Sequence, residues 1–222
     1  MRKIMIILLI VALALTSGCG KKKKQTEKPL APTNLTAVGT SYDQIRLAWQ
    51  DRSDNEQGFK IYCSAYMNGY YSLIGAVSAN TTAAVHYDLD PLSSYYYYIS
   101  AYNRAGANMS NYAGGITQSG IKILSQNLGE KYDDACLKGQ ARNITNIMLD
   151  SVTLTAWFYD SNGVLLQTAN DYGFDIPAQT TWNYEIWAYN TELARVARYD
   201  LEVSDVDVWR SEKEAARTEL DW

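Results

Sequence analysis

The stretch Tyr95-Tyr96-Tyr97-Tyr98-Ile99-Ser100-Ala101-Tyr102 decides how this chain folds. Successive side chains of a β-strand point to opposite faces, so the stretch separates into two alternating sets. The set expected to face a core is Tyr95, Tyr97, Ile99 and Ala101, and the set expected to face solvent is Tyr96, Tyr98 and Tyr102. Aromatic residues favour strands, and no helical period is present. The stretch therefore predicts a β-strand with one buried and one exposed face.

The same alternation appears on the N-terminal side of this strand. Ile45–Trp49 alternates with a period of two, and Phe59, Ile61 and Cys63 share one face. Turn-forming sequences separate the runs at residues 53–58, 68–69 and 103–106. Several short strands at this spacing predict a β-sandwich over residues 32–118.

A second alternating region follows Ser119-Gly120. Val152, Leu154, Ala156 and Phe158 share one face, and a turn follows at residues 160–163. Further strand-like runs continue to about residue 209, so residues 121–209 are predicted to form a second β-sandwich. The tail, residues 210–222, contains Glu, Lys, Ala and Arg and is expected to form a short helix.

Residues 32–118 resemble a fibronectin type III domain. Pro32–Ala37 is similar to the first strand of that family, Leu47-Ala48-Trp49 to its strand B, and Leu89–Tyr95 to its tyrosine corner. Asp51–Tyr62 and Tyr102–Gly106 resemble its B–C and F–G regions. The resemblance implies that the Tyr95 hydroxyl makes a hydrogen bond to backbone upstream of it.

Residues 121–209 resemble the FxLYD family of small Ig-like bacterial domains. The resemblance is carried by Gly139–Asn143, Ser151–Leu154 and Ala156–Asp160, with Gly163 after them. Ala156 stands where the family has Phe, and Phe158 stands where Leu is usual. The two resemblances imply an all-β chain with two Ig-like β-sandwiches in tandem.

The N-terminus has the pattern of a secretory signal. Arg2 and Lys3 precede twelve apolar residues, Ile4–Leu15, which are too few to span a bilayer. Thr16-Ser17-Gly18-Cys19 follows and resembles the lipobox of bacterial lipoproteins, with Leu15 one place further from the Cys than usual. Residues 1–18 are therefore predicted to be a signal peptide. The resemblance implies that signal peptidase II cuts before Cys19, which then carries lipid.

The lipoprotein interpretation also predicts where the protein is located in the cell. Several acyl chains on Cys19 imply stable anchoring to a cell membrane, and Gly20 after it favours the outer membrane in a Gram-negative host. Residues 19–31 include Lys21–Lys24 and are expected to be a flexible linker.

The charge of the second half restricts the class of partner. Residues 119–222 contain nine basic and 17 acidic residues, and this acidity argues against nucleic acid as a partner.

Besides the lipid-carrying Cys19, the sequence contains two further cysteines, Cys63 and Cys136, each in an apolar run. They are expected to be two buried free thiols, with a disulfide between the domains as the alternative.

No catalytic or metal-binding pattern stands out. Asp51, Ser53, Asn55 and Glu56 resemble a calcium loop, but the EF-hand positions for Gly and Glu are held by Glu56 and Tyr62, so a hydrogen-bonded turn is favoured. His86 is the only histidine and is expected to be half-exposed on a strand. We therefore predict no enzyme activity, no metal and no cofactor. An unrecognised hydrolase site is the weaker alternative.

Aromatic side chains supply the candidate binding residues. Tyr62 has the outward parity on a strand expected to pair with 95–102, so Tyr62, Tyr96, Tyr98 and Tyr102 are predicted to line one exposed face. Either this face binds a partner, or the tyrosines merely pair across strands or are covered by the other domain.

Other aromatic residues fall outside this face. Tyr66, Tyr70 and Tyr71 are expected at the neighbouring hairpin. Trp157, Trp187 and Tyr189 have outward parity in the second half, and the two tryptophans are expected to be buried at the junction of the domains.

The sequence thus predicts a membrane-anchored, non-enzymatic lipoprotein of the cell envelope that binds or scaffolds another envelope protein. The alternative is a surface lipoprotein that binds a glycan through exposed aromatic rings.

Overall fold

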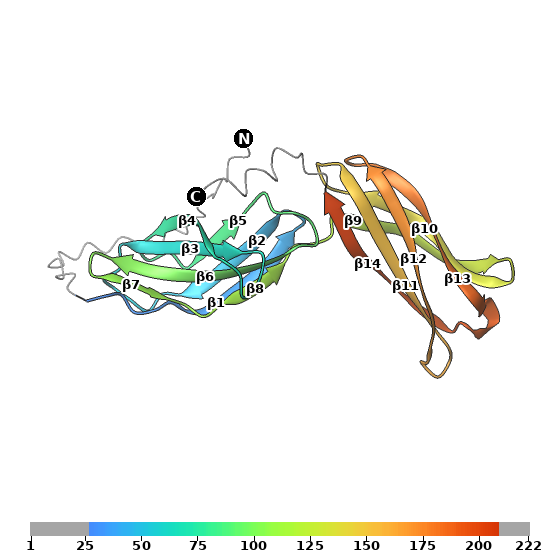
Figure 1. The fold of residues 1–222 in the computed structure, drawn as a ribbon, viewed down its shortest axis with the longest axis horizontal. Coiled ribbons are helices and arrows are strands. Elements are labelled where there is room, and N and C mark those ends of the chain that lie inside the picture. Colours follow the sequence, from blue (N-terminus) through green and yellow to red (C-terminus); the bar gives the residue numbers. More distant parts are fainter. Residues whose placement is uncertain (1–26, 209–222) are drawn as a thin grey trace, which may run out of the picture. The chain divides into compact units, whose positions relative to one another are not determined.

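The computed structural model describes residues 27–208, and this part of the chain consists of two compact units that meet between Gln118 and Ser119. Both units are built from antiparallel strands and contain only one short helical element, the 3₁₀ turn η1 (Leu193–Arg195) (Figure 1). The all-β prediction of two Ig-like sandwiches is confirmed. The predicted signal peptide, Cys19 and the tail at 210–222 lie outside the described residues.

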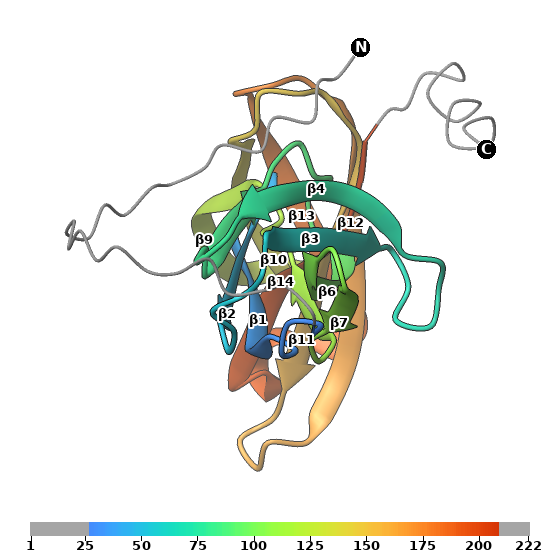
Figure 2. The ribbon, with the colours of Figure 1, turned by 90° about the vertical axis from the view of Figure 1, so that its left-hand side faces the viewer.

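The first unit packs two sheets against each other. One has the order β1-β2-β5, from β1 (Thr33–Ser41), β2 (Gln44–Gln50) and β5 (Ala83–His86). The other has the order β4-β3-β6-β7, from β4 (Ser72–Ser78), β3 (Gly58–Ser64), β6 (Ser94–Asn103) and β7 (Gly106–Met109); β8 (Ala113–Ile116) also pairs with β6. Figure 2 shows β4, β3, β6 and β7 in this order.

The core of the first unit follows the predicted alternation. Tyr97, Ile99 and Ala101 on β6 are fully buried and meet Ile61 and Phe59 of β3 in the core. Across the sandwich, Leu47 and Trp49 of β2 close the core, and the ring of Trp49 packs at 5.6 Å from that of Phe59.

The predicted tyrosine corner is present. Tyr95 is half-buried, and its hydroxyl accepts a hydrogen bond of 3.0 Å from the backbone N–H of Asp90. This bond closes the crossover that leads into β6, as the resemblance implied.

The prediction for His86 is wrong. β5 buries Ala84 and His86 and turns Ala83 and Val85 outward, so the histidine lies in the core. Its Nδ1 lies 3.1 Å from the hydroxyl of the buried Tyr97. This hydrogen bond offsets the cost of burying an imidazole, and sequence alternation alone does not reveal such a partner.

The second unit contains two three-stranded sheets. The first has the order β13-β10-β9, from β13 (Thr181–Glu192), β10 (Asp134–Asn143) and β9 (Ile121–Lys131). The second has the order β12-β11-β14, from β12 (Leu165–Ile176), β11 (Leu149–Tyr159) and β14 (Arg198–Val208). The inward set on β11 is the predicted one: Val152, Leu154, Ala156 and Phe158.

Candidate functional site

The outer face of the β4-β3-β6-β7 sheet carries the predicted tyrosines. In the pairing of β3 with β6, Tyr62 stands opposite Tyr98, Ser64 opposite Tyr96 and Gly58 opposite Tyr102. All four tyrosines are half-buried and share the face turned away from the core. Lys60, opposite Ser100, is the one charged residue in these rows of β3 and β6.

Two of the four predicted tyrosines are in direct contact. The rings of Tyr62 and Tyr98 stack with centroids 4.6 Å apart and planes 12° from parallel. Tyr71 lies 5.3 Å from Tyr98, and Tyr112 lies 5.7 Å from Tyr98 and 5.3 Å from Tyr71. These four residues, Tyr62, Tyr71, Tyr98 and Tyr112, are called the tyrosine cluster below.

Tyr96 and Tyr102 stand on the same face outside the stack. Tyr96 lies flat beside Gly114, where an added Cβ would come within 3.0 Å of its Cε1 atom. The ammonium of Lys60 lies 5.2 Å from the ring centroid of Tyr102, a distance at which cation–π attraction acts. The face therefore has a stacked centre, with one further tyrosine on each side along β6.

Sequence reasoning missed part of the cluster. Tyr71 was expected at the hairpin tip with Tyr66 and Tyr70, but its hydroxyl donates to the backbone carbonyl of Met67 at 3.0 Å and its ring joins the cluster. Tyr66 and Tyr70 remain at the tip, with 76% and 88% of their surface exposed. Tyr112 lies between β7 and β8, where short glycine-rich strands leave no alternation from which to predict its direction.

Two residues of the cluster, Tyr98 and Tyr71, have hydroxyls whose pKa is raised. Burial raises the pKa of Tyr98, and the neighbouring Tyr62 and Tyr112 raise it further. Burial and then Tyr112 act in the same direction on the pKa of Tyr71. The Tyr98 hydroxyl is thus a neutral O–H donor on an aromatic surface, which suits hydrogen bonding to a partner's backbone or side chains.

Two titratable groups are buried in the core behind this sheet, the thiol of Cys63 and the imidazole of His86. Burial raises the pKa of the Cys63 thiol to about 11, although a hydrogen bond with Tyr97 acts against this. Burial lowers the pKa of His86 to about 4, with Asp88 opposing the change. At neutral pH the thiol is therefore protonated and the imidazole neutral, a state that fits a structural role.

One end of the first unit, formed by the β2–β3 and β6–β7 loops, holds the incoming chain. Asn103 and Asn55 donate from Nδ2 to the carbonyl of Glu27 at 2.8 and 3.2 Å. Asn108 donates to the carbonyl of Pro29 at 2.7 Å. Residues 27–31 were expected to belong to a flexible linker, but Glu27 and Pro29 are fastened to the domain by these side-chain amides.

The polar sequence at 51–56 forms a hydrogen-bonded turn, the structure that was predicted for it in preference to a calcium loop. The backbone N–H of Ser53 donates to Asp51 Oδ1 at 3.0 Å, and the buried Glu56 accepts from the N–H of Asn80 at 3.1 Å. Across the described residues 27–208, no group of three His, Cys, Asp or Glu side chains is arranged to hold a metal ion. Nor does this part of the chain contain a helix long and apolar enough to cross a membrane.

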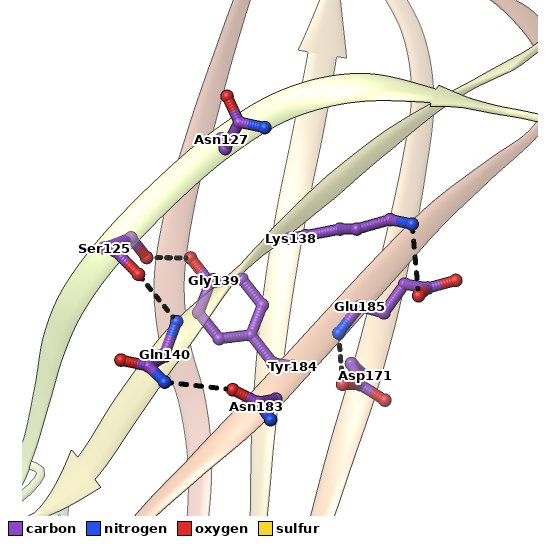
Figure 3. A pocket seen from close by; sticks show the side chains of 9 residues that line it. All are labelled: Ser125, Asn127, Lys138, Gly139, Gln140, Asp171, Asn183, Tyr184 and Glu185. Atoms are coloured by element: carbon purple, nitrogen blue, oxygen red, sulfur yellow. Dashed lines mark hydrogen bonds and ion pairs between the residues drawn. The ribbon is translucent and has the colours of Figure 1, made fainter.

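The second unit has a shallow polar hollow of about 480 Å³ on the β13-β10-β9 sheet (Figure 3). Its polar side chains interact with one another. Gln140 donates a hydrogen bond of 3.2 Å to Asn183, and Lys138 forms a salt bridge of 3.4 Å with Glu185. Beside them, the hydroxyl of Tyr184 donates to the carbonyl of Ser125 at 2.9 Å. These internal bonds leave the hollow without a buried group aimed at a ligand.

Glycine is needed where Tyr184 crosses β10. A Cβ at Gly139 would lie 2.0 Å from the Ser125 carbonyl oxygen and 2.5 Å from the Tyr184 hydroxyl. Burial raises the pKa of Tyr184 to about 12, so this hydroxyl stays a donor. Gly139, one of the residues that carried the resemblance of this half, therefore has a packing role.

The other predicted features of the second unit are structural as well. Cys136 is buried, and both it and Cys63 are free thiols. Trp187 is half-buried and stacks on Tyr189 at 3.9 Å, and the ring of Tyr132 lies 5.4 Å from it at a tilt of 45°. Its predicted burial at the junction of the domains stays a prediction, as does that of Trp157.

Comparison with known proteins finds similar solved structures, all at low identity. No curated protein matches the chain. The structure titled FN3tt is 20% identical and covers 42% of this chain and 99% of its own, with a TM-score of 0.37. The fn3 domain of human contactin 1 is 19% identical over 49% of this chain and 94% of its own, with a TM-score of 0.39. The chicken CNTN1 FN1–FN3 structure is 12% identical over 79% and 67%, with a TM-score of 0.36.

The family model described as fibronectin type III domain matches residues 30–113. Domains of this family generally act as protein-interaction or scaffold modules. The matched range contains both sheets of the first unit, apart from residues 114–116 of β8, and all residues of the tyrosine cluster. The first unit of this chain is a fibronectin type III domain.

Proposed function

We propose that this protein is a lipid-anchored, non-enzymatic component of the bacterial cell envelope that captures a protein partner on the outer face of its fibronectin type III domain. The observation that carries the proposal is the tyrosine cluster. Four rings from β3, β6 and the adjoining loops contact one another and form a continuous aromatic surface, and the pKa of Tyr98 within it is raised. Tyrosine is enriched at protein interfaces, and a few aromatic anchors often supply most of the binding energy.

The ring geometry favours a protein over a glycan. A sugar platform needs an open ring face, and one face of each of the Tyr62 and Tyr98 rings is covered by the other ring at 4.6 Å. The edges and hydroxyls of such rings suit the mixed apolar and polar surface of a protein. A protein-binding role also agrees with what fibronectin type III domains generally do.

Membrane anchoring rests on the sequence around Cys19. The acyl chains proposed there would tether the first domain to the cell membrane, which is the outer membrane in a Gram-negative host. Seven residues, 20–26, separate Cys19 from Glu27, where the domain fastens the chain. A fully extended chain of this length reaches about 25 Å, so the domain would work close to the lipid surface.

A binding role without catalysis is supported by the state of the reactive groups. The single histidine is buried against Tyr97, and the two thiols within the described residues are buried in different units. We further propose that the second unit is an FxLYD-like domain that serves as a scaffold, on the strength of the residues around Gly139 and Asn143.

The test replaces two cluster residues and follows capture of the partner. We expect the double variant Tyr62→Ala/Tyr98→Ala to lose about tenfold or more in affinity, because truncating anchors at the centre of an interface commonly costs more than 1 kcal/mol each. Proteins cross-linked to the full chain in intact envelopes are quantified by mass spectrometry against the unaltered protein. Thermal unfolding checks that the double variant folds.

The matched control removes two exposed tyrosines from the second unit, Tyr132→Ala/Tyr189→Ala, and should retain the partner. Equal loss from both variants, or no loss from either, would contradict a site on the tyrosine cluster. Binding to a glycan array that Tyr62→Ala/Tyr98→Ala abolishes would replace the protein partner by a carbohydrate. Mass spectrometry of the mature N-terminus tests the anchor, with acyl chains on Cys19 as the expected result.

A further inference from the structure

The β12-β11-β14 sheet of the second unit is shown in Figure 1. Its outer face carries an exposed aromatic pair. Tyr172 and Phe174, two residues apart on β12, are 54% and 68% exposed. Their ring centroids lie 6.3 Å apart, and their planes are 17° from parallel. Large exposed aromatic side chains side by side on a sheet are costly in water and mark interaction sites.

The register of the sheet places carboxylates level with these rings. Phe174 pairs with Ser151 of β11, which pairs with Asp207 of β14. Tyr172 pairs with Thr153, which pairs with Asp205. Each row therefore runs from an aromatic ring, across a small hydroxyl residue, to an exposed carboxylate two strands away, about 10 Å along the sheet.

No cation occupies these two rows within the described chain. The contact that the structure gives to Asp207 is with the Ser151 hydroxyl, at 3.2 Å. Arg198, which lies further along β14, is paired with Asp200 at 3.0 Å and lies over the Tyr159 ring. Residues 119–208 contain 13 acidic and six basic residues, so the surrounding field also attracts positive charge.

We infer that this aromatic–acidic face, defined by Tyr172, Phe174, Asp205 and Asp207, docks a basic segment of a partner protein through its Arg or Lys side chains. A long cationic side chain lays its methylene stem over Ser151 or Thr153 and against a ring, and its charged head reaches the carboxylate of the same row. Two rows in register, 6.3 Å apart at the rings, match alternate side chains of an extended peptide. The face is in the second unit, so its role does not depend on the tyrosine cluster.

The test measures binding of a fluorescein-labelled hexa-arginine peptide to the full chain by anisotropy, at low and at physiological salt. We expect Asp205→Asn/Asp207→Asn to weaken binding about tenfold or more, and Tyr172→Ala/Phe174→Ala to weaken it severalfold. The matched control Glu130→Gln/Asp133→Asn removes the same charge from the exposed end of β9 and the turn after it, and should change the affinity less than twofold.

Equal weakening by the two acidic pairs would mean that only net charge attracts the peptide, and the proposal would be overturned. Binding unaffected by Tyr172→Ala/Phe174→Ala would overturn it as well. Residues 209–222 follow β14 and contain Arg210, Lys213 and Arg217. Peptide binding that appears only after their removal would assign the face to the chain's own tail and overturn the docking of a partner.

Discussion

At the scale of single residues, His86 makes the stability of the fibronectin type III domain depend on pH. Burial lowers its pKa to about 4 in the folded domain, whereas an unfolded histidine has a pKa near 6.5. The unfolded chain therefore binds a proton that the folded chain rejects. The stabilising contribution is complete above about pH 6.5 and is lost as the pH falls toward 4, by roughly 3 kcal/mol.

Urea unfolding at pH 7 and pH 4.5, followed by tryptophan fluorescence, measures this effect. We expect the drop in unfolding free energy between the two pH values to shrink in His86→Gln, which keeps a hydrogen-bonding side chain near Tyr97 but does not titrate. An equal drop in both proteins would assign the acid sensitivity to carboxylates instead.

At the same scale, Asn143 illustrates what the sequence did not reveal. It is fully buried, and its amide donates to the carbonyls of Ile147, Ile176 and Pro177 while its Oδ1 accepts from Thr145. The sequence marks Asn143 only as part of a family resemblance. Its partners come from a loop and from the end of β12, and such contacts between distant segments cannot be read from alternation.

At the scale of elements, alternation predicted the strands because its period of two is a local property. It predicted the buried set on β6 and β11 for that reason, and it placed Tyr62 and Tyr98 on one face. It failed for His86, whose direction is decided by the hydroxyl of Tyr97 across the core. Tyr112 was also missed, because short strands interrupted by loops give no period to count.

The segment before β1, residues 27–31, is expected to be held to the domain by side-chain amides. Asn108 is exposed, and its Nδ2 holds the carbonyl of Pro29 at 2.7 Å. We expect Asn108→Ala to loosen the chain at Pro29 and to speed cleavage after Glu27 by endoproteinase Glu-C severalfold, although Asn55 and Asn103 still bond the Glu27 carbonyl. The unfolding free energy should change by less than about 1 kcal/mol, because one exposed hydrogen bond contributes little.

The exposed Asn68→Ala in the β3–β4 loop is the matched control and should leave this cleavage rate unchanged. If Asn108→Ala left it unchanged too, the Asn108 amide would not be what protects the bond after Glu27.

At the scale of the whole molecule, the two units each contain one buried free thiol, Cys63 in the first and Cys136 in the second. Each thiol therefore reports the opening of its own unit. The buried histidine lies in the first unit alone, so acid should loosen that unit first. The thiol of Cys63 should then become reactive before that of Cys136.

Labelling with 4,4′-dithiodipyridine, which reacts in acid, followed by peptide mass spectrometry, separates the two sites. Between pH 7 and pH 4.5 we expect the labelling rate of Cys63 to rise by about sixtyfold, since the loss of roughly 2 to 3 kcal/mol reached at pH 4.5 raises the open population by about that factor. The rate at Cys136 should rise much less, and His86→Gln should remove most of the difference. Equal acceleration at both thiols would show that the units open together, and the acid response would then belong to the whole chain instead of to one buried imidazole.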